Sequence, residues 1–169
     1  MDAAVGAHGA LGSTAGAEWW RARASLAIAG RALLVDGRAD LLYGVLRGDD
    51  APFERFVVGG VASPFVDHSL LAQRVVLPAV PVGYASGRNV AAARLSSVVG
   101  PLTPFYWLIS AGERLERWQR IVGVERTYSL PARPALGLPS VTLSGGAAFS
   151  IDEPRRHALQ GWFTVRYAP

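Results

Sequence analysis

The sequence predicts an all-β protein, an antiparallel up-and-down β-barrel of the transmembrane type. The first reason is a set of runs in which apolar and polar residues alternate, as they do along a strand with one buried face. The second reason is the content of 19 Gly and 11 Pro residues, which suits strands joined by turns better than long helices. The two runs nearest the C-terminus, residues 140–152 and 158–167, are each about as long as the roughly 9–11 residues that cross a bilayer as a tilted strand. We therefore expect a sheet whose apolar face meets lipid.

The N-terminal segment, residues 1–17, is rich in Gly and Ala and lacks the basic start and apolar middle of a signal peptide. We expect it to be flexible. The barrel segment then covers residues 18–169, with a long loop at residues 49–88.

The longest alternating segment, residues 18–34, carries apolar residues on one face and charged residues on the other. Asp36-Gly37 is a two-residue hairpin signal, so residues 38–48 are expected to return as the next strand. In that strand the residues expected to face outward are Leu41, Tyr43 and Val45.

Further strands are expected at residues 89–99, 104–111 and 118–129, before the C-terminal pair; the middle one carries three consecutive aromatic residues. The total is about seven strands, which is odd, whereas bacterial single-chain barrels have even numbers. We therefore expect an incomplete C-terminal segment of a barrel with an open, curved sheet. Its last strand should pair with upstream strands of the same polypeptide that this chain does not contain.

Residues 49–88 interrupt the regular pattern. Only two short strands, at residues 55–60 and 73–77, are expected there. Long irregular segments in a compact domain are usually functional or disordered, and the aromatic and aliphatic content favours an ordered, buried loop. We expect it to act as a plug or gate in the lumen.

Two sets of side chains follow from the alternation. The residues expected to line the lumen are Arg21, Arg23, Arg31, Arg94, Glu125 and Arg166. The aromatic residues expected near strand ends, as in the interfacial girdles of membrane barrels, are Trp19, Trp20, Tyr106, Trp107, Trp118, Tyr128, Trp162 and Tyr167.

The order of the segments resembles a known family. A strand carries Phe56, Gly59 and Gly60 in a Phe-x-x-Gly-Gly pattern, a long excursion contains Gly83-Tyr84, and further strands run to the C-terminus. This order is similar to the C-terminal half of the BamA/TamA superfamily of outer-membrane insertase and translocation barrels. In that family the excursion is the sixth extracellular loop, which folds into the lumen and carries an Arg-Gly-Tyr/Phe tip.

The resemblance implies a divergent member located in the outer membrane. The tip arginine of the family falls at Val82 here, so Arg88 is the candidate substitute. The loop and lumen motif that the resemblance implies consists of Phe56, Gly59, Gly60, Gly83, Tyr84 and Arg88. The function implied is protein or solute passage, or insertion of outer-membrane proteins, with lipid, the upstream strands and client proteins as partners.

Residues with catalytic or metal-binding chemistry are sparse, and we expect neither an enzyme nor a cofactor or metal site. Asp67-His68-Ser69 contains the residue types of a hydrolytic triad, but neighbours on an extended chain point apart. The three His residues are isolated, and Cys is absent. The 17 basic residues are all Arg and are spread along the chain, which argues against nucleic-acid binding.

Two alternatives remain. One is a soluble all-β ligand-binding module, a sandwich or a lipocalin-like barrel, which would place its apolar residues inside and its polar residues outside. The other is an enzyme whose catalytic residues lie upstream of this chain.

Overall fold

The computed structural model describes residues 1–14, 17–32, 35–48, 55–59, 74–75, 84–131, 140–152 and 159–168. Within these residues every regular element is a β-strand, arranged in an eight-stranded sheet and a three-stranded sheet. In spatial order the main sheet contains β1 (Asp2–Thr14), β2 (Ala17–Ala32), β3 (Val35–Gly48), β7 (Asn89–Val98), β8 (Thr103–Gly112), β9 (Gln119–Leu130), β10 (Ser140–Ser150) and β11 (Gln160–Ala168). The small sheet, which we call the plug sheet, has the order β5 (Arg74–Val75), β4 (Phe56–Val58) and β6 (Ala85–Gly87).

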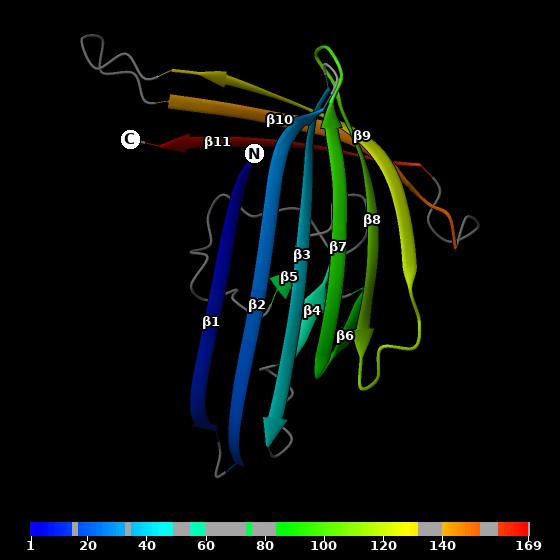
Figure 1. The fold of residues 1–169 in the computed structure, drawn as a ribbon. Helices are drawn as coiled ribbons and strands as arrows, with labels where there is room; N and C mark the ends of the chain where they lie inside the picture. Colours follow the sequence, from blue (N-terminus) through cyan, green and yellow to red (C-terminus); the bar gives the residue numbers. More distant parts are fainter. Residues whose placement is uncertain are drawn as a thin grey trace.

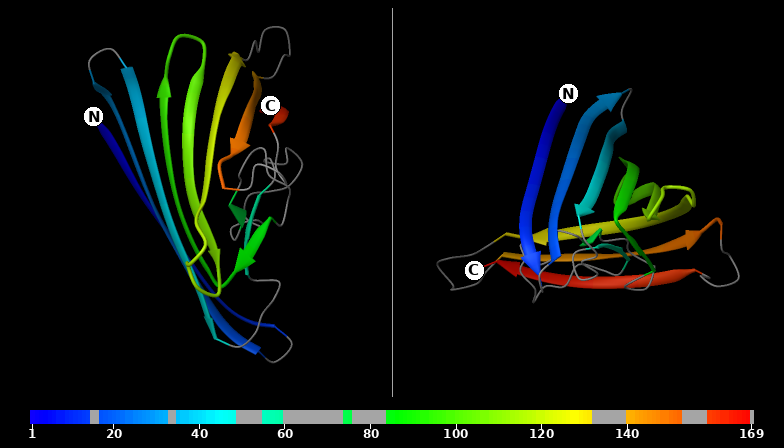
Figure 2. Two further views of the ribbon diagram at one scale, coloured as in Figure 1. Left: turned by 90° about the vertical axis from the view of Figure 1, so that its right-hand side faces the viewer. Right: turned by 90° about the horizontal axis from the view of Figure 1, so that it is seen from below.

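The main sheet is an antiparallel meander, because each strand pairs with the next main-sheet strand along the chain. It is strongly curved, so that β10 and β11 run crosswise to β1, β2 and β3 and lie behind them, on the side that bears the plug sheet (Figures 1 and 2). The strands β1 and β11 form its two edges, so the sheet is open and not a closed barrel. The predicted all-β, antiparallel up-and-down class is confirmed at this level.

The plug sheet lies on the concave side of the main sheet (Figure 2). Its strands β4 and β5 fall within the two short strands expected in the excursion, whereas β6 was not expected. Here "concave face" means the side of the main sheet that bears the plug sheet, and "convex face" means the opposite side.

The expectation of a flexible N-terminus at residues 1–17 is wrong for residues 2–14. They form β1, which pairs with β2 over its whole length, from Asp2 opposite Ala29 to Thr14 opposite Ala17. The sequence signal is weak because Gly and Ala have low strand propensity and pack little surface. The main sheet therefore has eight strands where about seven were predicted.

The hairpin predicted at Asp36-Gly37 is also misplaced. Both residues lie inside β3, opposite Arg31 and Gly30 of β2, and the pairing continues to Ala32 opposite Val35. The connection therefore falls at residues 33–34, which the structure does not describe. Strand pairing extended beyond the local turn signal, because each further pair adds ladder hydrogen bonds.

The core lies between the concave face and the plug sheet. Its buried apolar residues come from both sheets: Leu46, Phe56, Val58, Val90, Ala92, Phe105, Ile109, Ile121 and Ala148. A single cluster of this kind joins the two sheets into one packed unit.

Candidate functional site

The contact between the plug sheet and the concave face is centred on Phe56. This side chain is fully buried, and Val58 on the same face of β4 is 1% exposed. Opposite them, Gly44 of β3 leaves room for the ring, since a Cβ built at Gly44 would lie 2.5 Å from Phe56 Cζ and 2.9 Å from Val90 Cγ1. The close approach of the Phe56 ring to β3 therefore requires glycine at this position of the main sheet.

The motif implied by the resemblance is partly described. Gly59 follows β4 with φ 117°, a conformation that L residues with a Cβ rarely adopt, which accounts for glycine after Phe56-Val57-Val58. Tyr84 is partly buried against the core. Gly60 and Gly83 lie outside the described residues.

Arg88 attaches the plug sheet to the end of β3. Its Nη2 donates to the carbonyl oxygen of Gly48, and its own carbonyl oxygen accepts a hydrogen bond of 2.7 Å from the Leu46 amide. Arg88 was expected to substitute for the arginine at the loop tip of the family, which would place its guanidinium in the lumen. Within the described ranges its guanidinium instead satisfies a backbone carbonyl at the rim.

A polar group next to this attachment was not predicted from the sequence. Asn89, at the start of β7, accepts from Arg47 Nη1 at 3.0 Å and donates from Nδ2 to the carbonyl oxygen of Glu113 at 2.6 Å. The Glu113 carboxylate lies 3.1 Å from Nη1 of Arg55, the residue that precedes β4. Asn89 is 8% exposed, and buried amides of this kind need such partners. These contacts fix the base of the plug sheet to the loop after β8.

The expected lumen residues lie on or near the concave face. Arg23 pairs with Gly44 and Arg21 with the core residue Leu46, and cross-strand partners share a face. Arg31 has the same parity in β2 as Arg21 and Arg23. Its Nε lies 3.8 Å from Asp36 Oδ1, and both side chains are largely exposed. Arg166 pairs with Thr142 in the strand register, and its side chain is outside the described part of the structure.

Arg94 and Glu125 form an ion pair across β7 and β9 on the concave face. Their side chains are 24% and 23% exposed, so the pair is shielded from water but not sealed from it. The Arg94 guanidinium also lies 5.4 Å from the ring centroid of Phe105 and 5.8 Å from that of Trp107. Stacking on two rings holds the cation in place and strengthens the pair.

Replacing Arg94 with Met is expected to lower the free energy of unfolding by about 1–3 kcal/mol, because the Glu125 carboxylate then loses its partner in a half-buried site. The double variant Arg94→Met/Glu125→Gln should recover part of this loss. Denaturant titration of the folded protein in detergent measures both. Arg126→Met, on the opposite face of β9, is the matched control and should leave the free energy of unfolding nearly unchanged. If the effects of Arg94→Met and Glu125→Gln on this free energy simply add in the double variant, the pairing is contradicted.

The convex face is apolar and exposed. One cross-strand row runs Val5, Leu26, Leu41, Ala93 and Leu108 over five adjacent strands without a polar side chain. Exposed large apolar residues of convex parity occur on six strands: Val5, Leu11, Trp20, Leu41, Tyr43, Leu95, Val122, Tyr128, Leu130, Phe163 and Val165. We call these residues the outer band. Soluble monomers rarely expose an apolar surface this continuous.

Most charged residues of convex parity lie at strand ends. Glu18 and Arg120 are the second residues of their strands, and Arg47 is the second-last residue of β3. Arg126 is the exception, because it lies inside β9 and pairs with Gly145 of β10. Long charged side chains at strand ends reach an interface at low cost.

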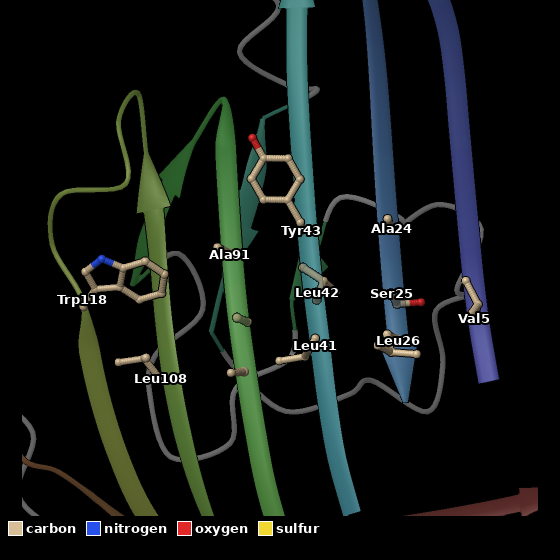
Figure 3. Close-up of a pocket in the computed structure, with 12 residues that line it drawn as sticks. Val5, Ala24, Ser25, Leu26, Leu41, Leu42, Tyr43, Ala91, Leu108 and Trp118 are labelled. Atoms are coloured by element: carbon tan, nitrogen blue, oxygen red, sulfur yellow. The ribbon is translucent and has the colours of Figure 1, made fainter. Parts of the chain in front are cut away.

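A shallow apolar hollow of about 500 Å³ lies on the convex face (Figure 3). Small residues such as Ala91 lie between larger ones, with Tyr43 on one side and Trp118 on the other. The hollow is continuous with the outer band, because Val5, Leu41 and Tyr43 of the outer band also line it.

The expected aromatic girdle is only partly on the convex face. Trp20, Trp118 and Tyr128 are exposed there or beside it. Trp19 and Trp107, however, pack on the concave core. Trp162 also packs there, with its ring centroid 6.0 Å from that of Phe105. For these three residues the girdle assignment is wrong, because the curved main sheet and the plug sheet enclose enough volume to bury large rings on the concave side.

Arg120 and Asp152 form an ion pair at the rim, with Arg120 Nη2 2.6 Å and Nε 3.0 Å from Asp152 Oδ1. The hydrogen bond from Arg120 lowers the pKa of Asp152 below its ordinary value of 3.8. Because the folded state holds the lower pKa, the pair stabilises above about pH 3.8, and this contribution is lost as the pH falls through the lowered pKa. Asp152→Asn is therefore expected to lower the denaturant midpoint at pH 7 and to converge with the wild type in acid.

Titration of the unfolding midpoint between pH 7 and pH 3 tests this. Glu116→Gln is the control, since its ion pair with Arg114 spans 3.7 Å between exposed side chains. Curves for Asp152→Asn and wild type that remain parallel down to pH 3 would contradict the role of the pair.

Within the described ranges, His, Asp and Glu side chains nowhere gather in threes as a metal site requires. Asp67, His68 and Ser69 lie outside those ranges. No described residue belongs to a helix that is long and apolar enough to span a bilayer.

Comparison with protein-family models, with curated proteins and with solved structures finds no match for this chain.

Proposed function

We propose that the chain forms part of the wall of an outer-membrane β-barrel, with the plug sheet in its lumen. The observation that carries this proposal is the outer band, in which large apolar side chains are exposed over the convex face, while the charges within the strands, Arg126 excepted, face the concave side. In lipid such a face is solvated by acyl chains, and in water it would be a large unfavourable exposure.

The activity that fits this arrangement is non-enzymatic. A wall with a docked plug controls passage of proteins or solutes, or takes part in insertion of other outer-membrane proteins, as the resemblance implies. The polar concave side, with Arg23 and the Arg94–Glu125 pair, lines the path. The partners are outer-membrane lipid, the further strands that complete the barrel, and client proteins or solutes.

The docked plug sheet also supports a gating role. Its contact with the wall combines a dry apolar centre at Phe56 with hydrogen bonds at the rim through Arg88 and Asn89. Such a contact is stable when formed and can be released as a unit, as gating requires.

The proposal is tested by expressing the full natural gene and fractionating the cells. We expect the protein in the outer-membrane fraction after carbonate extraction, with gel mobility that changes on heating. Recovery in a soluble fraction without detergent would overturn the proposal and favour the soluble ligand-binding module.

A further inference from the structure

The hollow on the convex face contains a groove along β7. Its floor consists of Ala91 and Ala93, which have the convex parity of β7. Leu41 and Tyr43 of β3 stand on one side of this floor, and Trp118 stands on the other (Figure 3). We call the space between them the β7 groove. Methyl groups between larger side chains leave room that an acyl chain can fill, and filling it restores van der Waals contacts that an empty groove would lack.

The β7 groove is complete whatever adjoins the edges of the main sheet. β7 pairs with β3 on one side and with β8 on the other, and both of these strands have a further neighbour. The groove therefore lies on interior strands. The inference drawn from it rests on the proposed function, because lipid is in contact with this face only if the sheet lies in a bilayer.

One end of the β7 groove is polar. Asn89 lies next to Ala91 on the same face of β7, and its Oδ1 accepts a hydrogen bond of 3.0 Å from Arg47 Nη1. The same Nη1 donates to the carbonyl oxygen of Leu46 at 2.9 Å. The Arg47 side chain is exposed, and within the described ranges its Nε and Nη2 make no hydrogen bond. These two donors are the pair with which a guanidinium binds a phosphate group.

A buried hydroxyl lies beside the floor of the β7 groove. Ser110 pairs with Ala91 and shares its face, is 2% exposed, and has no hydrogen-bond partner for Oγ in the part of the chain that the structure describes. Along the strands its row lies between that of Arg47 and that of Ala93. The ester carbonyls of a phospholipid, which lie between phosphate and acyl chains, would supply the acceptor that this hydroxyl lacks once the side chains covering it move.

We propose that the β7 groove binds one anionic phospholipid, with its phosphate at Arg47 and one acyl chain over Ala91 and Ala93. The positive charge of Arg47 selects a negatively charged headgroup. Trp20, the ladder partner of Arg47, is 43% exposed beside it, and aromatic residues of this kind mark the depth of the lipid headgroups. The acyl chain then runs from this level toward the middle of β7.

Quenching of Trp118 fluorescence by brominated lipids tests the proposal. The protein from the full natural gene is reconstituted in phosphatidylcholine vesicles that contain a minor fraction of brominated phosphatidylglycerol or of brominated phosphatidylcholine. The Trp118→Phe variant gives the quenching of the other tryptophans, which is subtracted. We expect Trp118 to report an apparent affinity about fivefold higher for phosphatidylglycerol, the effect of one Arg on an anionic lipid.

Three variants separate the headgroup contact from the groove. Arg47→Gln removes the charge and should abolish the preference for phosphatidylglycerol. Ala91→Leu fills the floor and should also abolish it, although Arg47 is intact. Ala39→Leu is the matched control, since Ala39 lies on the convex face of β3 between Ile28 and Leu95 in its cross-strand row and should leave the preference unchanged.

Two outcomes would overturn the lipid site while leaving the proposed function intact. One is equal quenching by the two lipids in the wild type, and the other is a preference that survives Ala91→Leu, which means attraction to the headgroup without a bound chain. Protein that fails to enter the vesicles, with gel mobility that does not change on heating, would instead contradict the proposed function and this inference with it.

Discussion

Ala93→Arg is expected to weaken folding into a bilayer by about 2–4 kcal/mol, since Ala93 lies at the middle of β7 on the convex face, in the row with Leu41 and Leu108. In a bilayer, an Arg side chain at this position must extend to the lipid–water interface or draw water into the hydrocarbon core. In a soluble protein the same substitution would place a charge on a solvated surface and would change stability by only about 0.5 kcal/mol or less.

The matched control is Ala27→Arg. Ala27 pairs with Asp40 on the concave face, where water and a carboxylate are both within reach. Folding into lipid vesicles at increasing urea, followed by the heat-dependent gel shift, gives both free energies. Similar values for the two variants, or a larger loss for Ala27→Arg, would show that the convex face does not meet lipid.

Phe56→Ala is expected to remove about 3–5 kcal/mol from the docking of the plug sheet, because the ring is fully buried between β4 and the wall. The main-sheet pairings do not involve Phe56, so the wall should remain folded while the plug sheet is released. Limited proteolysis should then cut within residues 49–88, and conductance of the reconstituted protein should rise.

A second pair of variants tests the same contact from the wall. Gly44→Ala places a methyl group where the Phe56 ring lies, so it should undock the plug sheet, and Phe56→Leu in the same chain should restore part of the docking. Gly37→Ala on the same strand is the control, since its Cβ would meet neighbours only at 3.9 and 4.0 Å. Strict additivity of Gly44→Ala and Phe56→Leu would contradict the contact.

Of the main-sheet strands all but β1 were predictable, most of them because apolar and polar residues alternate along them. The alternation also assigned Leu41 and Tyr43 to the outward face, and their side chains are 47% and 50% exposed. The strand β1 escaped prediction because Gly and Ala carry almost no periodic signal. It forms because β2 presents a long edge with which it can pair.

The site was less predictable than the strands. The sequence pointed to Phe56 and Arg88, but the partners of both come from distant segments: Gly44 and Val90 for the ring, and Gly48 for the guanidinium. No role was predicted for Glu113, and only its place beside Arg55 and Asn89 reveals its contribution at the base of the plug sheet.

By itself the sequence determined the β class and the parity of the main-sheet strands after β1, because side-chain direction along a strand is a local property with a period of two residues. The tertiary structure decided which side of the sheet is concave, where the plug sheet docks and which strands form the edges. These depend on curvature and on contacts between segments far apart in the chain, which no local pattern encodes.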